Sequence, residues 1–321
     1  MKRACGVLSR RSVLLAGIGA ALGSASHTAM GQRRRAAEAS QTGDSPTEAD
    51  MTGKIALVTG STDGLGRAVA ARLGALGATV LVHGRNRERG AEAVREVEAA
   101  GGQALFYRAD FASLDEVRAF ADTVLERHER LDLLINNAGI WTDGSEERRV
   151  SADGHELVFA VNYLAGYLLT RRLLPLIVRS APARIVNVSS LAQQPIDFDD
   201  VMLERGFSAS RAYAQSKLAQ VMFTIDLAAE LEGTGVTVNA LHPATLMDTA
   251  MVEKAGATPR STVEEGAAAV MRLAVSPELE GRSGLYFNGT QETRAHAQAY
   301  DEEARARLRQ LSVELTGEGR A

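Results

Sequence analysis

The sequence predicts an α/β domain built on a doubly wound parallel β-sheet of seven strands, with helices covering both faces of the sheet. Short runs of apolar residues alternate with longer amphipathic segments from Lys54 onward. This alternation of strands and helices is typical of parallel sheets. Several of the short runs contain a continuous apolar stretch, as expected for strands that are buried on both faces. No internal repeat or low-complexity break follows residue 53, so residues 53–321 are predicted to form a single domain.

Each predicted strand is a short apolar run, and an amphipathic segment long enough for several helical turns follows each one. The predicted strands are 55–59, 79–83, 104–108, 131–136, 184–189, 236–242 and 284–288. The predicted helices are 64–76, 86–100, 113–128, 154–180, 213–233, 262–275 and 292–315.

The composition is that of an ordinary globular protein, with 321 residues of which 45% are hydrophobic and 24% charged. The formal net charge of −4 argues against a nucleic-acid partner, which usually calls for a basic domain. Cys5 is the only cysteine in the sequence, so it excludes an intramolecular disulfide. The six histidines lack the paired spacing of metal ligands, and no metal site is predicted.

The N-terminal segment, residues 1–31, has the anatomy of an export signal. Basic residues precede a short apolar run at 13–23, which is too short to give a stable membrane span. The pair Arg10 and Arg11 resembles a twin-arginine signal, whose pathway exports folded proteins, so a periplasmic or exported location is predicted. If the segment is instead an uncleaved tail or follows a wrongly assigned start, the protein is cytoplasmic. Residues 32–52 are polar and are predicted to be a disordered linker.

A glycine-rich segment, TGSTDGLG, follows the first predicted strand and leads into a helix. Glycines let a backbone turn tightly and approach a pyrophosphate, and a helix N-terminus presents free N–H groups to it. Three glycines could also form a simple tight turn, but the order of strand, loop, helix and second strand favours a nucleotide site. The predicted cofactor-binding residues here are Gly60, Ser61, Thr62, Asp63, Gly64, Leu65 and Gly66.

The end of the second predicted strand bears on the choice of nucleotide. NAD-binding sites usually place an acidic residue there, whereas this sequence has Gly84 and Arg85. An arginine can form charge-assisted hydrogen bonds with a 2′-phosphate, so Arg85 predicts a preference for NADP(H) over NAD(H). The alternative is a solvated arginine in a basic turn, since Arg87 and Arg89 are close by.

Tyr213 and Lys217 lie four residues apart in the segment AYAQSKLAQ, which leads into a predicted helix. Residues at this spacing share one helix face. An ammonium beside a phenol favours the phenolate, which lowers the pKa of the phenol and suits it to general acid/base work. An isolated pair of this kind is more often an ordinary surface pair, so its meaning depends on the rest of the chain.

These segments together resemble the short-chain dehydrogenase/reductase superfamily over residues 53–316. TGSTDGLG is similar to its cofactor loop, NNAG at 136–139 is similar to the motif after its fourth strand, and its catalytic tetrad is matched by Asn162, Ser190, Tyr213 and Lys217. The resemblance implies a Rossmann fold with seven parallel strands. The long insertion at 197–212, between the serine and the tyrosine, is similar to that of the retinol-dehydrogenase-like branch.

The resemblance also implies a role for each member of the tetrad. Tyr213 would donate or remove a proton, and Lys217 would lower its pKa and bond the nicotinamide ribose. Ser190 would hydrogen-bond the carbonyl oxygen, with Ser189 as the rival for this role. Asn162 would hold a water that relays protons through Lys217; the alternative is an asparagine facing solvent from a helix interior.

Further cofactor contacts are implied by the resemblance alone. Asp110 would bond the adenine amino group, although it could instead cap the next helix, a role that Ser113 fills better. The NNAG residues Asn137, Ala138 and Gly139 would line the nucleotide site, with Asn137 contacting the adenosine or bracing a neighbouring strand. Thr245 would lie beside the nicotinamide carboxamide.

The predicted function is hydride transfer between NADPH and a carbonyl or alcohol of an apolar small molecule. Methionines in the loop after the sixth strand suit an apolar pocket, although ordinary packing explains them equally well; they are Met247 and Met251, to which Met202, Phe207 and Trp141 could add. Two alternatives remain open, namely a non-catalytic NADP-binding regulator and an enzyme that acts on a carbon–carbon double bond. A homodimer or homotetramer is expected from relatives that pair through the helices predicted at 154–180 and 213–233.

Overall fold

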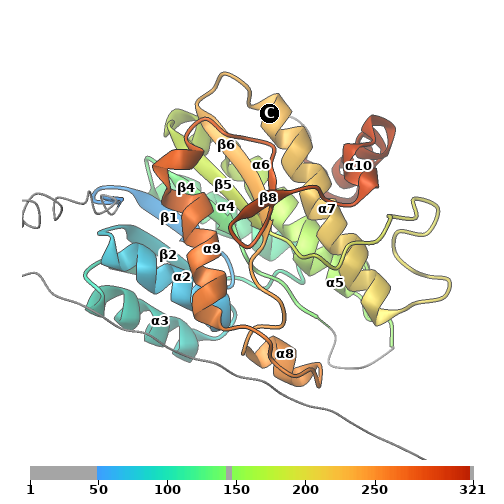
Figure 1. The fold of residues 1–321 in the computed structure, drawn as a ribbon, viewed down its shortest axis with the longest axis horizontal. Helices are drawn as coiled ribbons and strands as arrows, with labels where there is room; N and C mark the ends of the chain where they lie inside the picture. Colours follow the sequence, from blue (N-terminus) through green and yellow to red (C-terminus); the bar gives the residue numbers. More distant parts are fainter. Residues whose placement is uncertain (1–48, 142–146, 319–321) are drawn as a thin grey trace, which may run out of the picture. The chain divides into compact units, whose positions relative to one another are not determined.

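The computed structural model describes residues 49–141 and 147–318, and within them eight strands form one sheet (Figure 1). Their order across the sheet is β3-β2-β1-β4-β5-β6-β7-β8. The strands are β1 (Ile55–Val58), β2 (Thr79–Gly84), β3 (Gln103–Arg108), β4 (Leu133–Asn136), β5 (Ala183–Val188), β6 (Val236–His242), β7 (Tyr286–Asn288) and β8 (Gln291–Thr293). The first seven strands pair in parallel, as predicted.

The eighth strand was not predicted, and it pairs antiparallel with β7. Gly289 has a φ of 59°, so the chain can reverse directly after β7. The prediction of a helix over 292–315 is therefore wrong at its start. The residues after β8 form a short 3₁₀ turn, η3 (Ala297–Tyr300), and only then the helix α10 (Glu302–Thr316).

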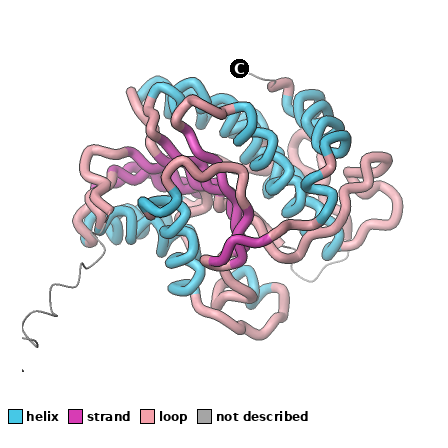
Figure 2. The backbone as a smooth tube through the Cα atoms, turned by 45° about the horizontal axis from the view of Figure 1, so that its top comes forward, coloured by secondary structure: helices cyan, strands magenta, loops and turns pink. Residues whose placement is uncertain are grey.

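Helices cover both faces of the sheet, as predicted, and Figure 2 shows the strands enclosed between them. The strand residues alternate between two apolar clusters: Leu57 and Leu134 face α4, α6 and α7, whereas Val58 and Ile135 face α2, α3 and α9. The main helices are α2 (Gly64–Ala75), α3 (Arg87–Ala99), α4 (Leu114–Arg127), α6 (Ala165–Arg179), α7 (Ala209–Glu230) and α9 (Val263–Val275), and a short α8 (Ala250–Lys254) follows β6.

The helix predicted over 154–180 is divided into three parts. It begins as α5 (Leu157–Phe159), because the Glu156 carboxylate caps it by accepting hydrogen bonds from the backbone N–H groups of Val158 and Phe159. The wider π-helical turn η1 (Ala160–Leu164) follows and leads into α6. π-helical turns inside helices often mark functional sites.

The helix predicted to begin at Tyr213 begins one turn earlier, as α7 from Ala209. Ser208 caps it, since its hydroxyl accepts from the backbone N–H of Arg211. Tyr213 and Lys217 are thereby held inside a regular helix rather than at its frayed end.

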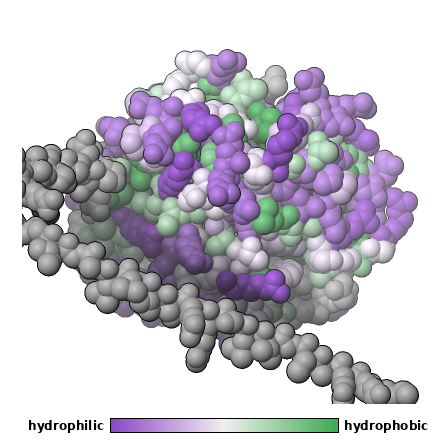
Figure 3. All heavy atoms as spheres, in the orientation of Figure 1, coloured by the Kyte–Doolittle hydropathy of each residue, from purple (hydrophilic) through white to green (hydrophobic). Residues whose placement is uncertain are grey.

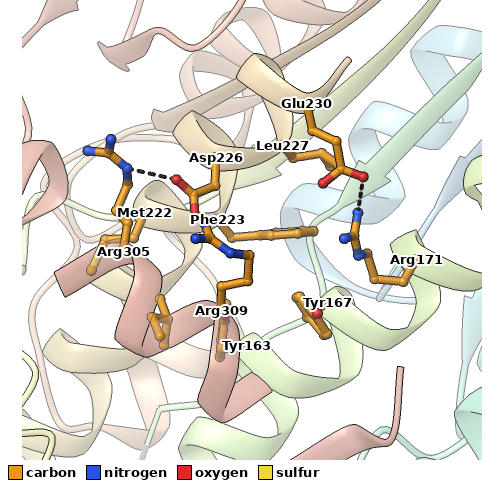
Figure 4. A pocket seen from close by; sticks show the side chains of 11 residues that line it. Tyr163, Tyr167, Arg171, Met222, Phe223, Asp226, Leu227, Glu230, Arg305 and Arg309 are labelled. Atoms are coloured by element: carbon orange, nitrogen blue, oxygen red, sulfur yellow. Dashed lines mark hydrogen bonds and ion pairs between the residues drawn. The ribbon is translucent and has the colours of Figure 1, made fainter. Parts of the chain in front are cut away.

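The C-terminal helix α10 packs against α7 and η1, where it helps to enclose a small pocket (Figure 4). Asp226 of α7 accepts hydrogen bonds from Arg305 and Arg309 of α10. The Tyr163 hydroxyl hydrogen-bonds that of Ser312 at 2.6 Å. Part of the surface of α7 through which pairing was expected is therefore covered by the chain itself. Homo-oligomerisation stays a prediction.

Polar side chains cover most of the face in Figure 3, with apolar side chains in small scattered groups. None of the helices in the described part of the chain is both long and apolar enough to cross a bilayer. The predicted signal, residues 1–31, lies outside the described residues, as does most of the predicted linker at 32–52.

Candidate active site

The order of strands in the sheet reverses between β1 and β4, so the loops that follow these two strands meet at one edge. Ligands of open parallel sheets bind at such a switch point. The Thr59 hydroxyl accepts hydrogen bonds from the backbone N–H groups of Asn137 and Ala138, both at 2.9 Å. The Asn137 amide donates to the carbonyl oxygen of Thr59 at 2.8 Å. Asn137 therefore braces the glycine-rich loop, the second of the two roles considered for it.

The glycine-rich loop has the shape of a nucleotide cradle. A Cβ on Gly66 would lie 2.4 Å from the Gly60 carbonyl oxygen, and Gly60 itself has a φ of 65°. Gly64 begins α2, and the Asp63 carboxylate caps this helix through the Gly64 N–H. Free N–H groups at a helix N-terminus beside closely packed glycines suit a bound pyrophosphate, so the residues present fit a dinucleotide. Thr62 lies against Gly84, where a side chain would clash with it.

Two side chains of this loop, those of Ser61 and Leu65, contact the protein interior. The Ser61 hydroxyl donates to the Val58 carbonyl oxygen at 2.7 Å and accepts from the His83 N–H at 3.0 Å. The Leu65 side chain is buried in the core. These two side chains therefore shape the loop, and the backbone N–H of Ser61 also donates to the His83 carbonyl oxygen at 2.9 Å.

His83, at the end of β2, was not predicted as part of the site. Its Nδ1 accepts a hydrogen bond from the Gly60 N–H at 3.1 Å, so Nε2 carries the proton and donates to the Ala109 carbonyl oxygen at 3.2 Å. The ring stacks on Phe111 and Phe120. His83 thus ties the glycine-rich loop to the end of β3.

Burial makes His83 acid-sensitive. It lowers the pKa of His83 from 6.5 to about 4. Between these two pH values His83 is mostly protonated in the unfolded chain but mostly neutral in the folded protein. The stability present above pH 6.5 is then lost as the pH falls toward 4, by about 2 kcal/mol between pH 7 and pH 5. We expect His83→Gln to remove this part of the pH dependence in urea unfolding at pH 7, 6 and 5. An unchanged slope in the variant would contradict the assignment.

Arg85 and Asp110 lie side by side after β2 and β3. Their charged groups are 3.6 Å apart, and the Arg85 side chain is 66% exposed. One Asp110 oxygen accepts from the Ala112 N–H at 3.0 Å. Ser113, not Asp110, caps α4. Arg85 and Asp110 therefore form an exposed ion pair at this edge of the sheet, where the Arg85 side chain is open to solvent.

Three members of the predicted tetrad meet at the carboxyl end of β5. The Lys217 ammonium lies 5.6 Å from the centre of the Tyr213 ring, and it donates to the Val188 carbonyl oxygen at 3.0 Å. Ser190 lies close enough to Tyr213 to lower the pKa of its hydroxyl, and the Ser190 hydroxyl accepts from the Ala192 N–H at 3.1 Å. The Ser189 hydroxyl instead donates to the Lys217 carbonyl oxygen at 2.7 Å. This arrangement favours Ser190 over Ser189 as the partner of a substrate oxygen.

The pKa of Tyr213 differs from the sequence prediction. Burial raises the pKa of Tyr213 above its ordinary value, and the neighbouring Ser190 hydroxyl only partly offsets this. Burial also lowers the pKa of Lys217 to about 7. Lys217 is then only partly charged at neutral pH, which is why it does not pull the pKa of Tyr213 down here. The expected lowering of the tyrosine pKa is therefore not found.

Asn162 lies in η1 and is 2% exposed, so the alternative of a solvent-facing asparagine is wrong. Its side-chain oxygen accepts from the Ile140 N–H at 2.7 Å, and its amide donates to the Ser216 hydroxyl at 3.1 Å. A Cβ on Gly139 would lie 3.3 Å from that side-chain oxygen and 3.5 Å from the Lys217 ammonium. The NNAG segment therefore runs directly beside the tetrad.

Comparison with known proteins identifies the family. The family model described as short chain dehydrogenase matches residues 54–260. The chain belongs to the short-chain dehydrogenase family. Mouse retinol dehydrogenase 14 is 38% identical to it, over 97% of this chain and 98% of that protein. Human retinol dehydrogenase 13 is 37% identical, over 86% and 88% of the two chains.

Solved structures agree with this placement. The Pseudomonas aeruginosa RhlG/NADP active-site complex is 30% identical with a TM-score of 0.61, covering 74% of this chain and 95% of that one. This short-chain dehydrogenase is therefore an oxidoreductase of a family that binds NAD(P).

The loop after β6 faces the glycine-rich loop of this dehydrogenase. The Thr245 hydroxyl lies 3.0 Å from His242 Nε2, so Thr245 stands at the strand end. Thr249 was not predicted, yet a Cβ on Gly64 would lie 3.2 Å from its methyl group. Leu246 has a φ of 50°, which is unusual for a residue other than glycine.

Five residues were considered for an apolar pocket. Among them, Trp141 makes a ring contact with the tetrad, since its ring centre lies 5.6 Å from that of Tyr213. Phe207 packs with Tyr213 against a small cluster around Leu203. Met202 packs against the main core, and its sulfur accepts from a backbone N–H. The structure thus gives Met202 a packing role. Met247 packs against the core under α9, and Met251 lies in α8.

Proposed function

We propose that this protein is an NADP(H)-dependent oxidoreductase that acts on a carbonyl or alcohol of an apolar small molecule, with Tyr213 as the general acid/base. The observation that carries the proposal is the meeting of Tyr213, Ser190 and Lys217 at one sheet edge, which they share with a glycine-rich loop built for a dinucleotide. A regulator without turnover has no need of this arrangement.

Each side chain then has a task. The nicotinamide cofactor supplies the hydride when it is bound. In carbonyl reduction Tyr213 donates its hydroxyl proton to the developing alkoxide oxygen, and Ser190 hydrogen-bonds the same oxygen. The raised pKa of Tyr213 keeps it protonated at neutral pH, which suits reduction; alcohol oxidation is favoured at higher pH. Lys217 would bind the nucleotide ribose.

The substrate proposal rests on the surroundings of Tyr213. The Trp141 ring lies beside the tyrosine ring, and Ile140 and Phe207 pack around the same small cluster. Aromatic and aliphatic side chains favour an apolar substrate over a charged one. The names of the retinol dehydrogenase relatives point the same way, so an apolar aldehyde or ketone is the first substrate class to test.

The test is NADPH oxidation by the purified protein against a panel of aldehydes and ketones of increasing apolar length, retinal among them. We expect turnover that rises with apolar length. Nucleotide binding without turnover of any carbonyl would favour the regulator. Turnover confined to carbonyls conjugated with a carbon–carbon double bond, with a saturated carbonyl as product, would favour double-bond reduction.

Arg85 should determine the cofactor preference. Arg85→Ala removes a charge-assisted partner of the 2′-phosphate, and we expect the ratio of NADPH to NADH affinity to fall by roughly 10-fold to 100-fold. Fluorescence titration with both nucleotides measures this ratio. Arg95→Ala, which removes an exposed arginine farther along α3, is the matched control. An equal ratio in Arg85→Ala and wild type would remove the NADP proposal.

A further inference from the structure

A glutamine amide that the sequence analysis did not single out lies between two members of the tetrad. Gln220 is one helical turn beyond Lys217 in α7 and is 5% exposed. Its side-chain N–H donates to the backbone carbonyl oxygen of Asn162 at 2.8 Å. Its side-chain oxygen accepts from the Lys217 ammonium at 3.0 Å. Gln220 thus links directly the two residues between which a relaying water was expected, Asn162 and Lys217.

The two contacts fix which way the amide points. With nitrogen and oxygen exchanged, an N–H group would face the ammonium and an oxygen would face a carbonyl oxygen, so both contacts would be repulsive. Asn162 and the backbone of Gln220 are themselves held in place. Asn162 is bonded to Ile140 and Ser216, and the Thr224 hydroxyl donates to the Gln220 carbonyl oxygen at 2.8 Å.

We propose that Gln220 is a positioning residue of this site, one that holds the Lys217 ammonium in place and stabilises its positive charge. This inference rests on the proposed function. An ammonium has three N–H donors. The contacts with Val188 and Gln220 use two of them, which leaves one for the ribose of a nucleotide.

Neutral oxygens are the main support of this charge. The titratable groups that face Lys217 are Tyr213 on α7 and His242 at the end of β6, and neither is an anion at neutral pH. Within residues 49–141 and 147–318, no carboxylate pairs with Lys217. A charge that is buried without an anionic partner depends on its hydrogen bonds, so the oxygen of Gln220 has a large share in keeping Lys217 charged.

Two substitutions separate the charge from the packing. Gln220→Glu keeps the size of the side chain and places a carboxylate beside the ammonium. Gln220→Leu removes both hydrogen bonds. The matched control is Gln215→Leu, which removes another buried glutamine of α7 whose amide donates to the Val201 carbonyl oxygen and does not touch Lys217.

The readout is the titration of Lys217 itself, followed by NMR of the full chain labelled with [ε-¹³C]lysine. The sequence holds only four lysines, at positions 2, 54, 217 and 254, so the Lys217 signal can be assigned with Lys2→Arg, Lys54→Arg and Lys254→Arg. We expect Gln220→Glu to move the titration midpoint about one to three pH units upward and Gln220→Leu about one unit downward. Gln215→Leu should leave it in place.

A midpoint in Gln220→Glu equal to that of the wild type would overturn the inference, and this variant decides the question alone if Gln220→Leu does not fold. The pH profile of kcat/KM for NADPH-dependent reduction should move in the same direction as the NMR midpoint. An NMR shift without any turnover would refute the proposed function but keep the hold of Gln220 on Lys217. Turnover without an NMR shift would support the proposed function but refute the hold of Gln220 on Lys217.

Discussion

Replacement of Tyr213 by phenylalanine should lower kcat/KM for carbonyl reduction by roughly 10² to 10⁴, the usual contribution of a general acid. The change removes only the hydroxyl. The ring keeps its packing beside Trp141 and Phe207, so the fold and NADPH binding should stay close to those of the wild type. Turnover of the best carbonyl of the panel gives the rate, and fluorescence titration gives the NADPH affinity.

A matched control is Tyr107→Phe. The Tyr107 hydroxyl hydrogen-bonds His128 at the end of α4, away from the tetrad, so its loss should leave kcat/KM unchanged. If Tyr213→Phe keeps more than about a tenth of the wild-type rate, the hydroxyl is not the proton donor of this reaction. Parallel loss of NADPH binding and activity would instead mean that the tyrosine is needed for the shape of the site.

The parts of the fold that were predicted are those with local signals. The first seven strands lie within two residues of their predicted bounds, because each is a short, mostly apolar run bounded by polar or turn residues. β8 has no such signal: its three residues are polar and exposed, and only the reversal at Gly289 places them beside β7. The π-helical turn at Asn162 has the same apolar composition as the helix around it.

The site residues likewise fall into those with a local sequence signal and those without one. The spacing of Tyr213 and Lys217 and that of the loop glycines are visible in the chain, and the structure places both groups at one edge of the sheet. His83 and Gln220 gave no signal, because their importance comes from contacts with Gly60 and Asn162, which are distant in sequence. Electrostatics were also beyond prediction, since burial, which spacing does not reveal, sets the pKa of Lys217.

The glycine-rich loop offers the second large effect, through Gly66→Ala. The added Cβ would lie 2.4 Å from the Gly60 carbonyl oxygen and 2.5 Å from the Asn137 amide nitrogen. The Cβ would clash with the backbone of Gly60 on one side and with the Asn137 amide on the other. The glycine-rich loop must therefore move away from its position in the wild type. We expect NADPH affinity to fall at least about 100-fold, which is roughly 2.7 kcal/mol of binding free energy. Overpacking should also cost about 1–3 kcal/mol of stability.

Gly166→Ala is the control that isolates this clash. A Cβ on Gly166, inside α6, would have its nearest neighbour at 3.7 Å, an ordinary contact. Alanine also favours a helix over glycine by about 1 kcal/mol, so this variant should melt at or above the wild-type temperature and bind NADPH normally. Thermal unfolding and NADPH titration on both variants make the comparison. Wild-type NADPH affinity in Gly66→Ala would mean that the nucleotide does not depend on the close approach of Gly66 to Gly60, and the phosphate-binding role of this loop would have to be abandoned.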